Sequence, residues 1–227
     1  MMRLSLACLC VGCAAMASAG EVIDCIAASV GRNVITRSAI QEQARITAFL
    51  NREPAAEFSA PNLRRTAERL IDVVLIRREM EISHYAASGE KEVEKILAGL
   101  RAGRASVKPE DFAQALAGYG IDEAALRRNL ALQTATLRFV ELRFRPGTSV
   151  SDSEIELFYR ENFAPEFVRQ NPGRKAPELD DVRDRIEASL LETRVDQAME
   201  QWLKESRSQA RITFFPESCP VGEAARR

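Results

Sequence analysis

Residues that carry catalytic chemistry are scarce in this chain of 227 residues. Its one histidine, His84, cannot build a zinc site, because such a site needs several histidine or cysteine ligands at matched spacing. The sequence contains no Gly-x-Ser-x-Gly elbow, Gly-x-Gly-x-x-Gly fingerprint or phosphate-binding loop. The carboxylate pairs Glu90/Glu94 and Asp180/Asp184 recur at helical spacing, as expected in a chain with 29% charged residues. We therefore expect no enzymatic activity, no metal and no cofactor.

An excess of charge of either sign is also missing. Lysine and arginine number 32, and aspartate and glutamate number 33, so the formal net charge is −1. Nucleic-acid binding normally needs a clustered basic face, so this balance argues against a nucleic-acid partner. The pairs Arg77-Arg78 and Arg127-Arg128 lie among acidic residues on predicted helices, which favours solvated surface over an anion-binding site.

Long hydrophobic runs are absent, since no segment reaches the roughly 18 apolar residues of a transmembrane helix. A short apolar run, Leu4–Met16, follows Arg3 and precedes Ala17-Ser18-Ala19, which is the pattern of a secretory signal peptide. We expect residues 1–19 to be this signal, with cleavage after Ala19. The mature protein is then expected in the periplasm, without stable insertion in the membrane.

Cysteine is rare beyond the signal, which holds three of the five cysteines. Cys13 offers an alternative, a lipoprotein signal, although a leucine is expected where Cys10 stands. The mature chain keeps Cys25 in the first predicted strand and Cys219 just beyond the last, and an oxidising compartment favours one disulfide between them. The chain-entropy model assigns about 5 kcal/mol to so long a loop. Two unpaired thiols are the alternative.

Strand patterns occur at both ends of the mature chain. Glu21–Val30 and Val34–Thr36 are rich in β-favouring residues, and the turn residues between them predict a hairpin. Ser38 is the expected N-cap of a helix over residues 39–50. Near the other end, Arg211–Phe215 predicts one closing strand.

Helical periodicity dominates the sequence between these strands. The helix that starts near Asn62 is apolar around most of its circumference from Leu70 to Ile76, so we expect it at the centre of the fold. Asp122 caps a long helix that reaches Arg145, and Ser151 or Asp152 caps the next. The last helix is expected over Leu179–Gln209.

The domain boundaries follow from proline and glycine. Residues 20–162 form the first part of one domain, and residues 163–177, with three prolines and a glycine, are expected to be a linker. Residues 178–215 supply the closing helix and strand, and residues 216–227 are expected to be a flexible tail. The predicted fold is mainly α, with about six helices and a small antiparallel sheet formed by the N-terminal hairpin and the C-terminal strand. These strands must pair with one another, because their backbone groups need partners.

The order of these patterns resembles the SurA-like periplasmic chaperones over residues 21–215. The segments that carry the resemblance are Val22–Val30, Val34–Thr36, Leu70–Asp72, Val150–Asn162, Gln201–Leu203 and Ala210–Ile212. Many members of the family insert a parvulin-type prolyl isomerase domain between the last two helices. Here only 15 residues, Phe163–Pro177, stand at that place, so no isomerase activity is expected.

The resemblance implies an ATP-independent holdase that binds unfolded outer-membrane or secreted polypeptides through apolar helical surfaces. We expect Leu132, Phe139 and Leu142 to help line the client surface; the alternative is that they pack against the terminal helix. The alternative function is a structural or adaptor protein of envelope assembly that binds one folded partner. The sequence does not decide the oligomeric state.

Overall fold

Three short strands bring the two ends of the described chain together. The computed structural model describes residues 24–54, 58–85, 89–103 and 109–215. Within it, β1 (Ile26–Val30) lies between β2 (Asn33–Thr36) and β3 (Ile212–Phe214) and is antiparallel to both. The predicted sheet, built from an N-terminal hairpin and a closing strand, is confirmed.

The turn of the hairpin also holds the closing strand. Gly31 has a φ of 59°, a left-handed conformation that glycine adopts without steric cost. Its backbone N–H donates to the Arg211 carbonyl at 2.8 Å, just before β3 begins. At the other end of β3, the Phe215 N–H donates to the Ala27 carbonyl at 2.9 Å.

The first helix, α1 (Arg37–Asn51), starts two residues earlier than the sequence predicts. Thr36 is its N-cap, with Oγ1 accepting from the Ala39 N–H at 3.3 Å, so the assignment of Ser38 to that position is wrong. Ser38 instead donates from its hydroxyl and its backbone N–H to the Asp24 carboxylate. The Ser38 hydroxyl is the main reason that the pKa of Asp24 lies below its usual value.

The central helix is α2 (Ala60–Ile82), as its apolar circumference predicts. It contacts the sheet, α1, α5 (Glu123–Phe144) and α8 (Leu179–Gln209). Its fully buried Ile71 shares a core with Ala28 and Ile35 of the sheet, and Trp202 and Leu203 of α8 pack against this core.

A second core lies between α1, α3 (Glu90–Gly103), α4 (Pro109–Gly118) and α5. Phe49 and Phe112 meet there edge to face, with ring centroids 6.0 Å apart. Asp122 is the N-cap of α5, as predicted, and accepts from the Ala125 N–H at 2.6 Å. A short 3₁₀ turn, η1 (Arg145–Gly147), follows α5.

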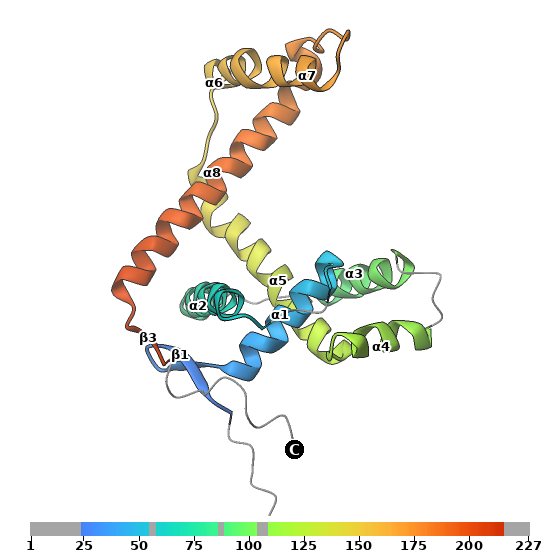
Figure 1. Cartoon of the computed structure of the whole chain (residues 1–227). Helices are drawn as coiled ribbons and strands as arrows, with labels where there is room; N and C mark the ends of the chain where they lie inside the picture. The colour runs from blue at the N-terminus through green and yellow to red at the C-terminus, as the bar shows by residue number, and fades with distance from the viewer. Residues whose placement is uncertain (1–23, 55–57, 86–88, 104–108, 216–227) are drawn as a thin grey trace, which may run out of the picture.

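The last helix, α8, has the bounds that the sequence predicts and is about 46 Å long for its 31 residues. Figure 1 shows it running from the sheet, across α5, to α6 and α7 at the far end of the molecule. We call the sheet, α1–α5 and the C-terminal half of α8 the body. The upper lobe is the remainder, residues 150–190. In the described ranges, no helix combines the length and apolarity that crossing a bilayer requires.

The upper lobe contains more helix than the sequence predicts. α6 (Asp152–Phe158) continues through a π-helical segment, η2 (Tyr159–Phe163), into α7 (Ala164–Gln170). The linker prediction for residues 163–177 is therefore wrong for its first half. Pro165 lies in the first turn of α7, where a missing N–H is tolerated, and the wider π segment precedes it. Of the two N-caps that the sequence offers, Ser151 is the one used, and its N–H donates to the Glu154 side chain at 2.8 Å in a capping box.

Arg207 ties the closing helix to the central one. Its Nε donates to Asp72 Oδ1 at 2.6 Å, while Nη1 and Nη2 donate to Glu68 Oε2 and to the Glu68 carbonyl, each at 2.8 Å. The three side chains are each about one-third exposed. Hydrogen bonds from Arg207 are the main cause of the lowered pKa of Glu68, and Asp72 and Glu68 raise the pKa of Arg207.

Replacing Arg207 with methionine should lower the free energy of unfolding by about 1–2 kcal/mol. The substitution keeps most of the apolar stem, but Asp72 loses its ion pair with Arg207 and Glu68 keeps only its ion pair with Arg64. Urea denaturation followed by circular dichroism measures the change. Lys204→Gln, at an exposed position of the same helix, is the matched control and should change stability little.

Acid should remove the difference between Arg207→Met and the unmodified protein. The folded-state pKa of Glu68 is depressed, so the stability that its ionised form contributes is present above its ordinary pKa of 4.5 and is lost as the pH falls below it. A stability difference that stayed constant from pH 7 to pH 3 would contradict this account.

Candidate functional site

The three residues expected to bind clients do not share one accessible surface. Phe139 is only 2% exposed, packs with Ile76 and Met80 of α2, and lies edge to face with Tyr85 at 5.4 Å. Its assignment to a client surface is wrong, because α2 and α8 cover this side of α5. Leu132 is half-buried, and Leu142 is 63% exposed.

The structure describes only one of the two cysteines of the predicted disulfide. Cys25 is half-buried just before β1. Cys219 lies outside the described residues, as do the expected signal, residues 1–19, and the expected tail, residues 216–227. The hydrogen bond from Phe215 to Ala27 brings the chain to within four residues of Cys219 while it is still beside β1. Pairing of Cys25 with Cys219 stays a prediction.

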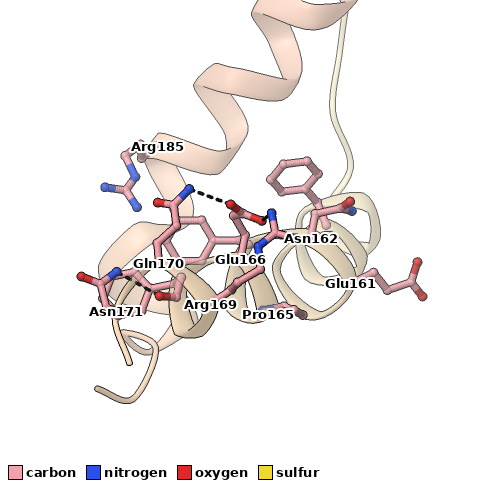
Figure 2. Close-up of a pocket in the computed structure, with 11 residues that line it drawn as sticks. Glu161, Asn162, Pro165, Glu166, Arg169, Gln170, Asn171 and Arg185 are labelled. Carbon is pink, nitrogen blue, oxygen red and sulfur yellow. Dashed lines mark hydrogen bonds and ion pairs between the residues drawn. The ribbon is translucent and has the colours of Figure 1, made fainter. Parts of the chain in front are cut away.

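The upper lobe carries an open hollow of about 790 Å³, drawn in Figure 2. The α6–η2–α7 helix forms most of it, and Arg185 of α8 completes it. Three aromatic rings, Phe158, Phe163 and Phe167, contribute its apolar lining. The polar lining includes three side-chain amides, from Asn162, Gln170 and Asn171.

A stack of rings organises this hollow. Tyr159, Phe163 and Phe167 follow one another at i, i+4 spacing, with centroid separations of 5.9 and 6.2 Å and interplanar angles below 30°. The Arg185 guanidinium lies 4.8 Å from the Phe163 centroid, a cation–π distance. The Tyr159 hydroxyl donates to the Pro177 carbonyl at 2.6 Å, which fastens the segment after α7 against the stack.

Beneath the stack, the upper lobe has its own small core. Ile155 of α6 packs against Val182 and Ile186 of α8, and all three are buried. Two ion pairs add to this contact between the helices: Arg183 with Asp152 at 2.9 Å, and Arg194 with Glu154. The hollow therefore lies on a lobe whose packing is largely separate from the body.

Two of the charged groups that line the hollow, Glu166 and Arg169, form an ion pair with each other. Glu166 accepts from Arg169 and from Gln170 Nε2, the latter at 2.6 Å, and the Arg169 hydrogen bond is the largest cause of its lowered pKa. Figure 2 shows the Glu166–Gln170 bond, and the Asn171 amide that donates to the Phe167 carbonyl at 2.9 Å. Glu166 is thus an ionised, paired carboxylate and a poor general base.

The remaining candidates for chemistry lie on solvated surface. His84 is exposed and follows α2 with a φ of 52°. Arg127 pairs with Glu94 and Glu123, as expected for a solvated helical face. Within the described ranges, no three histidine, cysteine, aspartate or glutamate side chains gather as metal ligands. What the upper-lobe hollow offers a ligand is therefore its aromatic rings and side-chain amides.

Sequence reasoning missed the aromatic stack, although its signal is readable. Tyr159, Phe163 and Phe167 stand four residues apart, which places them on one helical face. Pro165 stands inside this pattern and led to the prediction of a linker. The π segment that accommodates the proline has no clear sequence signature.

Comparisons with known proteins leave the family open. No protein-family model matches this chain, and no curated protein sequence matches it.

Replacing Tyr159 with phenylalanine should loosen the segment after α7. The substitution keeps the ring and removes the bond to Pro177, which is worth about 1 kcal/mol, so amide exchange over residues 171–178 should accelerate about fivefold. Hydrogen–deuterium exchange measured by mass spectrometry detects this change. Tyr119→Phe is the matched control, because its hydroxyl donates to the Glu53 carbonyl in the body, also at 2.6 Å. Unchanged exchange over residues 171–178 in Tyr159→Phe would disprove the role of this bond.

If Cys25 and Cys219 are bridged, the natively purified protein should not react with an alkylating reagent until it is reduced. Intact-mass spectrometry should then show two added labels after reduction. Cys25→Ser should release Cys219 and allow one label without reductant. Two labels on the unreduced protein would show that both thiols are free.

Proposed function

We propose that this protein is a passive chaperone, a holdase that binds unfolded outer-membrane or secreted polypeptides in the periplasm without ATP. The observation that carries the proposal is the open aromatic hollow of the upper lobe. Stacked rings attract apolar and aromatic side chains of many kinds, and neighbouring amides can bond to a peptide backbone. Such a surface is suited to varied clients, whereas recognition of one small molecule favours an enclosed pocket.

Other exposed apolar side chains support binding through spread, weak contacts. Leu157 of α6 and Val168 of α7 expose 44% and 47% of their surface in the upper lobe. On α5, Leu142 is 63% exposed. Single exposed side chains of this kind are common on soluble proteins, so the aromatic hollow carries the argument and these residues extend it.

The expected periplasmic location is consistent with a chaperone that works without ATP. The signal pattern in residues 1–19 directs the protein to the periplasm, where ATP is not supplied, so binding and release must be equilibrium processes. Burial of apolar client segments provides a suitable driving force, because unfolded chains expose such segments before they fold. The resemblance to SurA-like chaperones supports the same function, and the short connection between α7 and α8 leaves no room for a parvulin domain.

The direct test is suppression of aggregation. A urea-unfolded outer-membrane protein is diluted into buffer with and without the chaperone, and light scattering is followed. We expect the unmodified protein to reduce scattering for several unrelated clients. Failure with every client, together with stable binding of one folded envelope protein, would favour the adaptor function. No prolyl isomerase turnover above background is expected on a proline peptide.

Paired variants locate the client surface in this assay. Phe167→Ser should raise the chaperone concentration needed for half-maximal suppression roughly tenfold, since a large aromatic contact is worth about 1.5 kcal/mol. Leu137→Ser, at an exposed position in the body, is the matched control and should have little effect. Leu142→Ser tests the most exposed of the three residues that the sequence assigned to client binding, without disturbing the buried Phe139. Equal loss in Phe167→Ser and Leu137→Ser, with both variants folded, would remove the special role of the hollow.

A further inference from the structure

A second hollow, of about 240 Å³, lies in the body between the sheet and the N-terminal halves of α1 and α2. Its wall is mainly apolar and includes Ile40, Phe58, Leu63, Phe214 and Phe215. Ligand pockets for drug-sized molecules occupy about 300–1,000 Å³, so this hollow fits a group the size of one or two small residues. It lies beside the sheet, far along α8 from the aromatic hollow of the upper lobe (Figure 1).

Charge does not select the occupant of this second hollow. Of the two arginines in its wall, Arg64 donates to Glu68 at 2.9 Å and lies 3.6 Å from the centroid of the Phe214 ring. Arg37 also interacts within the chain. The remaining wall is apolar, so burial of apolar surface is the force that would fill the hollow.

The chain leads both cysteines of the predicted disulfide past this hollow. Two residues of its wall, Arg37 and Ala27, adjoin Cys25: the Arg37 N–H donates to the Cys25 carbonyl at 2.9 Å, and Ala27 stands two residues after Cys25. Phe215, also in the wall, donates from its N–H to the Ala27 carbonyl at 2.9 Å. Cys219 follows Phe215 by four residues, a span of at most about 14 Å. The second hollow therefore borders the shortest path between the two thiols.

The sequence after β3 contains one short stretch suited to an apolar hollow. Cys219–Val221 is uncharged and stands between two acidic residues, Glu217 and Glu223. Residues 216–227, whose placement the structure does not describe, include no leucine, isoleucine, methionine or aromatic residue. Val221 is thus the most apolar side chain that this segment can place in the hollow.

We propose that the Cys25–Cys219 disulfide holds residues 219–221, here called the strap, across the second hollow with the Val221 side chain inside it. The hollow is then closed in the oxidised protein and opens on reduction. Val221 follows the anchoring cysteine by two residues, so it stays within about 7 Å of the bridge. Pro220 between them restricts the backbone, which lowers the entropy lost when the strap is ordered. The inference rests on the predicted disulfide and is independent of the chaperone function.

Closing the strap is a two-electron oxidation that needs an oxidant carrying a disulfide. The thiolate of one cysteine attacks that disulfide, forms a mixed disulfide and releases one thiol of the oxidant. The thiolate of the other cysteine then attacks the mixed disulfide, forms the Cys25–Cys219 bond and releases the second thiol. The two protons of the protein thiols end on the released thiols, and a dithiol reductant reverses both steps.

Nuclear magnetic resonance of the unmodified protein, labelled at isoleucine, leucine and valine methyl groups, tests where the strap lies. After oxidation with glutathione disulfide, we expect nuclear Overhauser effects from the Val221 methyls to those of Ile40 and Leu63. These effects should disappear on reduction with dithiothreitol. Val221→Ala identifies the Val221 signals. A bridged protein without these effects would overturn the proposal, and so would the absence of the Cys25–Cys219 bridge after oxidation.

The thiol–disulfide equilibrium measures what the apolar contact contributes. In glutathione buffers, with alkylation and intact-mass spectrometry as the readout, Val221→Ser should make the bridge about fivefold easier to reduce, as expected when a partly buried valine is lost. Ala224→Ser, beyond the strap, is the matched control and should leave the equilibrium unchanged. Equal shifts in the two variants would contradict a specific contact of Val221.

A second pair of variants tests the same contact from the side of the hollow. Ala60 lines the hollow at the exposed start of α2, so Ala60→Glu should also favour reduction without unfolding the protein. Asn62→Glu adds the same charge to the same exposed helical turn outside the hollow and is the control. An unchanged equilibrium in Ala60→Glu would count against the strap.

Two further outcomes separate this proposal from its alternatives. Nuclear Overhauser effects to Ile40 and Leu63 from Val22 or Ile23, and none from Val221, would assign the hollow to the segment before β1 and overturn the strap. If the strap closes as expected but the protein suppresses no aggregation, the chaperone function falls and the strap stands. If suppression is seen without the strap contacts, only the strap falls.

Discussion

The antiparallel pairing of β1 with strands from both ends of the described chain is the constraint on which the rest of the structure depends. β2 follows β1 directly, but β3 comes some 180 residues later, so all the helices of the described residues lie inside the loop that this pairing closes. Buried backbone groups must find partners, and without β3 one side of β1 would lack them. The closing helix is therefore brought against α2, where Arg207 holds it on Glu68 and Asp72.

The length of α8 then divides the molecule. Its C-terminal half completes the core beneath the sheet through Trp202 and Leu203, while its N-terminal half extends past the body and packs with α6. The aromatic hollow thus lies on a lobe with a small core of its own. This hollow combines aromatic rings with an arginine stacked on one of them, Arg185 on Phe163. That chemistry is suited to reversible binding of apolar and aromatic groups.

Sequence patterns predicted the start of a helix well where the chemistry of a single capping residue decides it. Asp122 and Ser151 cap their helices as expected, and the amphipathic pattern gave the bounds of α8. Ser38 failed as a cap because Thr36, two residues earlier, competes for the same backbone, and Asp24 offered Ser38 another partner. Pro165 was interpreted as a helix breaker because the π segment that accommodates it depends on a change of hydrogen-bond register, which propensity does not encode.

The sequence by itself determined the helical class, the strands at the two ends and the absence of recognisable catalytic motifs, since these follow from periodicity and residue type. Only the tertiary structure decided which apolar residues are core and which are surface. Phe139 and Leu142 lie three residues apart on α5, yet one is buried under α2 and α8 and the other faces solvent. Periodicity describes the faces of one helix, whereas the neighbours that cover those faces are set by how distant segments pack.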